Sequence, residues 1–101
     1  MKKSQEIIAE FIRLYQEFFQ SHSKKAAEKI LAFMRDEETI SVAKRLATHN
    51  PHPNIHQSFE RDWEATITSL ESWLEGKVDF SVPSGFLEDI RTWITEDFTA
   101  L

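Results

Sequence analysis

Cysteine is absent from the 101 residues of the sequence. Its absence excludes disulfide bonds, thiol catalysis, and zinc or iron–sulfur sites that use cysteine ligands. No apolar run reaches the roughly 18–20 residues that a membrane span requires. Near the N-terminus, Glu6, Glu10 and Arg13 also interrupt any apolar segment of a signal peptide. We therefore expect a cytoplasmic protein that does not associate with a membrane.

Glycine and proline are scarce as well, with two and three residues, and all of them lie between residues 51 and 85. The sequence therefore has no glycine-rich phosphate loop and no nucleophile elbow. Runs that alternate apolar and polar residues, the pattern of β-strands, are nearly absent. The composition, with 41% hydrophobic and 29% charged residues, suits one compact helical domain, which we expect to span residues 1–101.

Apolar residues instead recur at spacings of three and four, as they do in amphipathic helices. Helix caps, a phase break and helix-stopping residues divide this pattern into five segments. They run from Ser4 to about Gln20, from Ser23 to near Asp36, from there to Asn50, from about Ile55 to Gly76, and from Ser84 onward, with Lys77–Ser84 as a loop. We expect an all-α fold, a single compact helical bundle of four long helices plus one short helix. The predicted core residues are Phe11, Phe18, Ile30, Leu46, Trp63, Ile67, Leu70, Ile90 and Trp93.

Histidines gather where the third predicted helix gives way to the fourth. His49, His52 and His56, with Glu60 one turn further on, are residue types that bind zinc or non-haem iron. A metal- or histidine-dependent enzyme built on this cluster is the alternative hypothesis for function. Polar residues also collect at ordinary helix–helix connections, and a genuine metal site needs supporting hydrogen-bond partners. We therefore expect no bound metal and no cofactor, and we favour a protein that is not an enzyme.

The same stretch has the element order of a helix-turn-helix, with Ser41–Thr48 followed by Ile55–Ala65. That motif normally has a turn of about three to four residues, whereas this connection is longer and contains two prolines. Its second helix would present three acidic residues and only Arg61 as a basic one. Because DNA binding depends on neutralising phosphates, we expect no nucleic-acid partner.

Acidic residues are concentrated in the second half of the chain. Residues 51–101 contain three Lys or Arg against ten Asp or Glu, whereas residues 1–50 contain nine against seven. All three tryptophans also lie in the acidic half. Charge asymmetry of this kind carries no information about the fold, but it steers association with charged partners.

Four of these acids, Glu60, Glu64, Glu71 and Glu75, fall within about 75° of one another on the predicted fourth helix, at 100° per residue. We call them the acidic ridge. Like charges four residues apart cost about 0.2–0.5 kcal/mol per pair, and no lysine lies on the same stripe of this helix. A solvated helix face is the simpler interpretation, yet such faces commonly mix both signs, and a cationic partner would explain the cost.

These observations predict a small acidic helical module that binds another protein through a basic surface of that partner. The acidic ridge would steer association, and aromatic residues at its edge would contribute affinity. Inhibitors, antitoxin- or immunity-type proteins and adaptors share this size and charge, and all of these roles are regulatory. Pairing with a second copy of the chain is left open.

Overall fold

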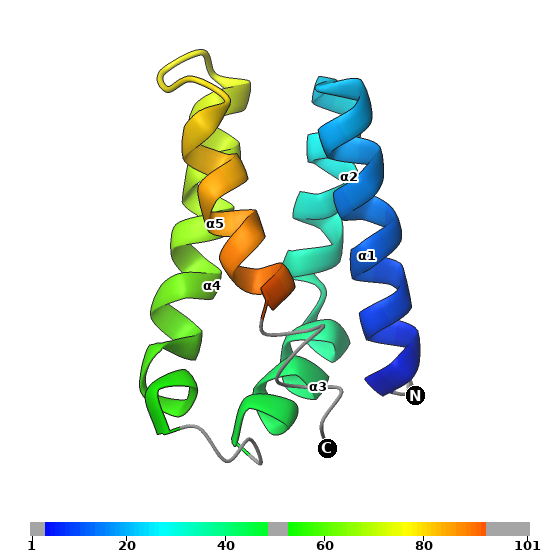
Figure 1. Ribbon diagram of the computed structural model, residues 1–101, viewed down its shortest axis with the longest axis vertical. Helices are drawn as coiled ribbons and strands as arrows, with labels where there is room; N and C mark the ends of the chain where they lie inside the picture. Colours follow the sequence, from blue (N-terminus) through cyan, green and yellow to red (C-terminus); the bar gives the residue numbers. More distant parts are fainter. Residues whose placement is uncertain (1–3, 49–52, 93–101) are drawn as a thin grey trace.

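The computed structural model describes residues 4–48 and 53–92, and the side chains of residues 5–45 and 60–92. These residues form five helices and no strand, so the predicted all-α fold is confirmed. The helices are α1 (Ser4–Ser21), α2 (Lys24–Arg35), α3 (Glu37–Thr48), α4 (Pro53–Leu74) and α5 (Ser81–Thr92). Figure 1 shows α1, α2, α4 and α5 lying along the long axis as two antiparallel pairs, with α3 across one end.

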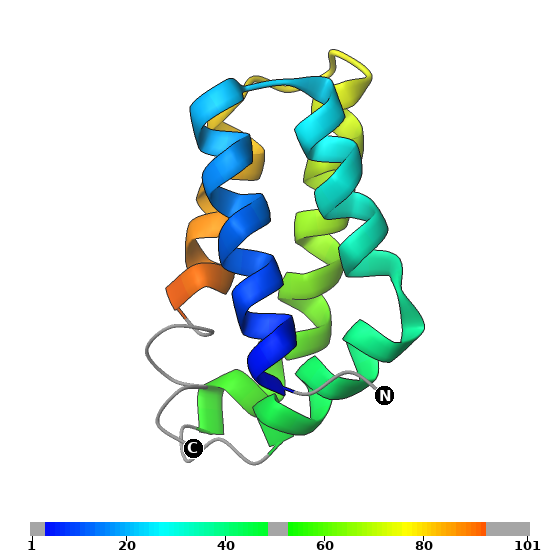
Figure 2. The ribbon, with the colours of Figure 1, turned by 90° about the vertical axis from the view of Figure 1, so that its right-hand side faces the viewer.

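Asp36 separates α2 from α3, where the sequence predicts a break in the apolar pattern. Its carboxylate accepts hydrogen bonds from the backbone N–H of Thr39 at 2.9 Å and from the Thr39 hydroxyl at 3.0 Å. These bonds cap the first turn of α3, and the chain changes direction there (Figure 2). Helix α3 has 12 residues, as many as α2. Its direction across the bundle, rather than a shorter length, therefore sets it apart from the other helices.

Helix α5 begins at Ser81, whereas the sequence pattern predicts a loop over Lys77–Ser84. The carboxylate of Asp79 accepts a hydrogen bond from the backbone N–H of Ser81 at 3.0 Å and so starts the helix. Pro83 lies in the first turn, where proline is tolerated because the N–H groups there have no partner inside the helix. The prediction of a loop is therefore wrong for residues 81–84, because the Asp79 carboxylate caps a helix that begins at Ser81 and includes Pro83.

Most of the predicted core is buried. The buried predicted residues, each at most 3% exposed, are Phe11, Phe18, Ile30, Trp63, Leu70 and Ile90. Ile67 is only partly buried and packs against the edge of the core. Leu46 and Trp93 lie outside the residues whose side chains are described.

Three polar side chains among the described residues are also buried, and each has a hydrogen-bond partner. The Thr39 hydroxyl donates to Asp36, as described above. The hydroxyl of Thr66 donates to the Asp62 carbonyl at 2.7 Å, and that of Ser69 donates to the Thr66 carbonyl at 2.8 Å. Because these hydroxyls are satisfied by their own helix, they can lie in the core without the penalty of an unpaired polar group.

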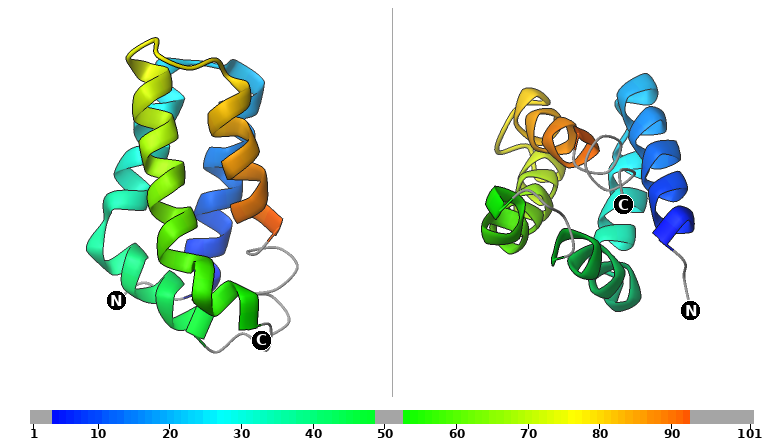
Figure 3. Two further views of the ribbon diagram at one scale, coloured as in Figure 1. Left: turned by 90° about the vertical axis from the view of Figure 1, so that its left-hand side faces the viewer. Right: turned by 60° about the horizontal axis from the view of Figure 1, so that its bottom comes forward.

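Aromatic side chains join the two helix pairs at the end opposite α3. The α1–α2 turn and the α4–α5 connection both lie at this end (Figure 3, left). The ring of Phe18 lies 4.9 Å from that of Phe80 and 5.5 Å from that of Trp73, and His22 stacks on Phe80 at 4.0 Å. Ring pairs of this kind contribute about 0.5–1.5 kcal/mol beyond the burial of their area. The cluster therefore packs α1 against α4 and against the connection that follows α4.

The two glycines allow a matched test of backbone conformation. Gly85 lies within α5, and a Cβ added there meets nothing within 4 Å. We expect Gly85→Ala to raise the free energy of unfolding by about 0.5–1 kcal/mol, because alanine loses less backbone entropy in a helix. Gly76 has a φ of +78° at the end of α4, a conformation that residues with a Cβ rarely adopt. Gly76→Ala should therefore lower the free energy of unfolding by about 1–2 kcal/mol. Urea unfolding measures both, and two changes of the same sign would contradict this account.

Candidate functional site

The structure places Glu60, Glu64 and Glu71 of the acidic ridge on the solvent-accessible side of α4, as the helical period predicts, and Glu75 directly follows the last residue of the helix. Glu60, Glu64 and Glu75 are exposed, and Glu71 is partly exposed. The inward side of the same helix, which adjoins the ridge, carries Leu70, and Leu70 is fully buried. The amphipathic pattern of α4 therefore determines both which side packs into the bundle and which acids face solvent.

Three acids of the ridge form ion pairs with basic side chains from elsewhere in the chain. One basic residue comes from α2, one from α3 and one from the segment after α4. The pairs are Arg35–Glu71 at 2.5 Å, Lys44–Glu60 at 2.6 Å and Lys77–Glu75 at 2.8 Å. The spacing of residues along α4 predicts no compensating lysine for the ridge. Arg35 and Lys44 reach the ridge because α2 and α3 pack beside α4, and Lys77 lies in the turn that follows the helix.

All three ion pairs are open to solvent. Their side chains are between 46% and 72% exposed, and ion pairs of this kind contribute about 0–1 kcal/mol to stability. The hydrogen bond from Lys44 lowers the pKa of Glu60, and the hydrogen bond to Glu75 raises the pKa of Lys77. Glu60 therefore keeps its charge to lower pH than a free glutamate does, and its pairing is lost only as the pH falls through that lowered pKa.

Glu64 differs from the other three acids. Within residues 5–45 and 60–92, no basic side chain pairs with its carboxylate. The same residue lines two hollows, one on each side of α4. Glu64 is thus the acid of the ridge that is both uncompensated and adjacent to apolar surface.

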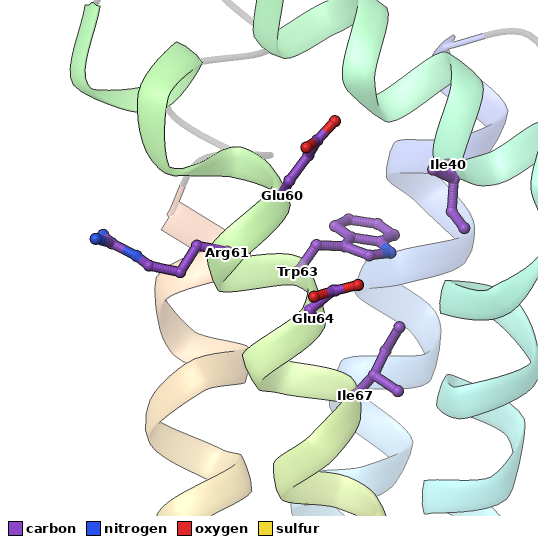
Figure 4. Close-up of a pocket in the computed structure, with 6 residues that line it drawn as sticks. All are labelled: Ile40, Glu60, Arg61, Trp63, Glu64 and Ile67. Atoms are coloured by element: carbon purple, nitrogen blue, oxygen red, sulfur yellow. The ribbon is translucent and has the colours of Figure 1, made fainter.

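The first hollow, which we call the α3–α4 hollow, has a volume of about 340 Å³. Figure 4 shows Glu60, Trp63, Glu64 and Ile67 pointing from α4 toward Ile40 of α3, while the remaining lining residue, Arg61, points the other way. The indole N–H of Trp63 donates a hydrogen bond to the backbone carbonyl of Met34 at 2.9 Å. This bond holds the ring in one orientation at the base of the hollow.

The second hollow, the α4–α5 groove, has a volume of about 490 Å³. Val78, Val82 and Phe86 line one side of it, and Arg61, Glu64 and smaller residues of α4 line the other. Val82 is 37% exposed and is the one large hydrophobic side chain classed as exposed among the described residues. The groove therefore adds accessible apolar surface beside the acidic ridge.

The histidine cluster lies almost entirely outside the described side chains. His49 and His52 are not described, and of His56 the structure gives only the backbone, within α4. Glu60 is described, and it pairs with Lys44. No group of three or more potential metal-ligating residues occurs within the described part of the chain. The expected absence of a metal therefore stays a prediction.

Comparison with known proteins gives no relative to argue from. No family model, no curated protein and no solved structure matches the chain. None of the helices in the described ranges is long and apolar enough to cross a membrane.

Sequence reasoning finds the acids of this site but misses the hollow beside them. Trp63 is predicted as a core residue, which is correct, and its role at the base of a hollow is not visible from the pattern. Ile40 belongs to a different helix, and nothing in the sequence places it opposite Ile67. The only local signal is that Glu60 and Glu64 flank a tryptophan on the same helix.

Proposed function

We propose that this protein is a regulatory binding module that uses the acidic ridge to bind a basic surface on another protein, as an inhibitor, antitoxin- or immunity-type protein or adaptor does. The observation that supports this function is the position of Glu64. Its carboxylate is exposed, has no ion pair among the described residues, and lies between two hollows with apolar linings.

The ion pairs along the ridge are compatible with this role. Because exposed pairs contribute little to stability, a partner's lysine or arginine can replace Lys44 or Arg35 at the ridge at small cost. The acids then supply long-range attraction that accelerates association. Apolar side chains of the partner would enter the hollows and provide the desolvated contacts on which affinity depends.

A pair of charge reversals tests this function. Glu64→Lys and Glu28→Lys change the net charge equally, and both replace exposed helical acids that form no ion pair within the described side chains. The wild-type chain and both variants are immobilised and exposed to an extract of the native host at low and high salt. We expect basic proteins to be retained by wild type and Glu28→Lys and to be lost with Glu64→Lys.

The kinetics with a purified retained protein complete the test. We expect Glu64→Lys to reduce the association rate about three- to tenfold at low salt, with a smaller reduction at high salt, because rim charges act mainly on association. Equal retention by wild type and both variants would contradict the proposal. The binding surface would then have to be sought on the basic N-terminal half, around Lys24 and Lys25.

A further inference from the structure

We propose that the α3–α4 hollow binds one arginine side chain of the protein partner. This inference rests on the proposed function and names the chemical group that the ridge recognises. The hollow combines an apolar base with two carboxylates at its edge, and arginine is the side chain that satisfies both features.

The base of the hollow is formed by Ile40, Trp63 and Ile67. Its volume of about 340 Å³ is at the lower end of the roughly 300–1,000 Å³ found for small-ligand pockets, which suits one long side chain. The methylene groups of an arginine would pack on the two isoleucines and remain out of water. The Trp63 ring is held by its hydrogen bond to Met34, so its orientation is set before binding.

The edge of the hollow carries Glu60 and Glu64, which lie one helical turn apart with Cβ atoms about 5–6 Å from each other. Both side chains point toward the hollow (Figure 4). A guanidinium group has five N–H donors in one plane, so it can donate to both carboxylates at once. An ammonium group is a compact point charge without that planar geometry.

The basic side chains that the structure describes leave Glu64 available. Lys44 reaches Glu60 at 2.6 Å, which shows that a cation is accommodated at one edge of the hollow. Arg61 points away from the hollow (Figure 4), and its Nε–H donates to Asp62 at 3.3 Å. A purely apolar side chain in the hollow would remove water from the two carboxylates without replacing the lost hydrogen bonds. The charge at the edge therefore favours a cationic occupant.

Two-dimensional NMR of the full chain tests this inference with N-acetyl-arginine amide as the probe. N-acetyl-citrulline amide is the matched control, because it has nearly the same shape and no charge. We expect arginine to shift the Trp63 indole N–H signal and the backbone amide signals of Ile40 and Ile67, with a dissociation constant on the order of millimolar. The citrulline derivative should shift these signals at least about tenfold less at equal concentration.

Two substitutions that remove a carboxylate charge test whether Glu64 binds the guanidinium group. Glu64→Gln keeps the size of the side chain and should weaken arginine binding at least about threefold, whereas Glu28→Gln should leave it unchanged. The dispersion of the NMR spectrum shows that each variant is folded. Equal shifts with arginine and citrulline, equal affinity for N-acetyl-lysine amide, or an unchanged affinity in Glu64→Gln would each overturn the assignment of arginine.

The outcome is separable from that of the proposed function. A basic protein that is retained by wild type and lost with Glu64→Lys, together with no arginine response at the hollow, would support the function and overturn this inference. An arginine response without any retained basic protein would overturn the function itself.

Discussion

We expect Phe18→Ala to lower the free energy of unfolding by about 3–5 kcal/mol. Phe18 is fully buried, and its ring contacts Phe80 and Trp73 across the two helix pairs. Removing the ring leaves a cavity at the place where α1 meets α4. Because a domain of this size has a stability of roughly 5–15 kcal/mol, this change removes a large share of it.

Urea unfolding followed by circular dichroism measures the effect of this substitution. Gln20→Ala is the matched control, since Gln20 is an exposed residue near the same end of α1 and should change stability by at most about 0.5 kcal/mol. A loss below about 1 kcal/mol for Phe18→Ala would show that the aromatic cluster does not hold the two helix pairs together.

Leu70→Ala should lower the free energy of unfolding by about 2–5 kcal/mol. Leu70 is fully buried on the inward side of α4. Helix α4 contacts α2, α3 and α5, so a cavity at this position weakens the packing of several neighbours. The cost combines the lost burial of the side chain with the cavity that remains, because the surrounding helices collapse only partly.

The matched control on α4 is Thr68→Ala, which alters an exposed position within the same turn and should change stability by at most about 0.5 kcal/mol. Both substitutions are measured by denaturant unfolding, with the slope of the transition compared to verify that the unfolded state is unchanged. A loss under 1 kcal/mol for Leu70→Ala would mean that the buried face of α4 is assigned incorrectly.

The acidic ridge illustrates how far sequence reasoning extends into a functional site. Side chains at intervals of three, four and seven residues must share one side of any helix, so Glu60, Glu64, Glu71 and Glu75 lie together whatever surrounds them. Whether Glu60 and Glu71 are compensated depends on residues far away in the chain, whereas Glu75 pairs with the nearby Lys77. Arg35 is on another helix, and its approach to Glu71 requires α2 and α4 to pack side by side.

The elements themselves were determined mainly by local sequence. Ser23 caps α2 by accepting a hydrogen bond from the N–H of Ala26 at 3.1 Å, and Asp36 separates α2 from α3. Gly76 takes up the positive φ that follows α4. Each of these features acts within a few residues, so the periodicity and the cap residues predict it. The start of α5 is the exception, because the pattern predicts a loop as far as Ser84, whereas the Asp79 carboxylate caps a helix that begins at Ser81.

Only the tertiary structure determined which helices contact one another. The crossing of α3 over the end of the bundle brings Ile40 opposite Ile67 and Lys44 to Glu60, and so creates the α3–α4 hollow. The same packing brings the indole of Trp63 to the Met34 carbonyl. A helical pattern specifies which side of a helix is buried, but several different helices could pack against the same apolar side. The pairing of helices depends on how all their side chains fill the core together, which no local segment contains.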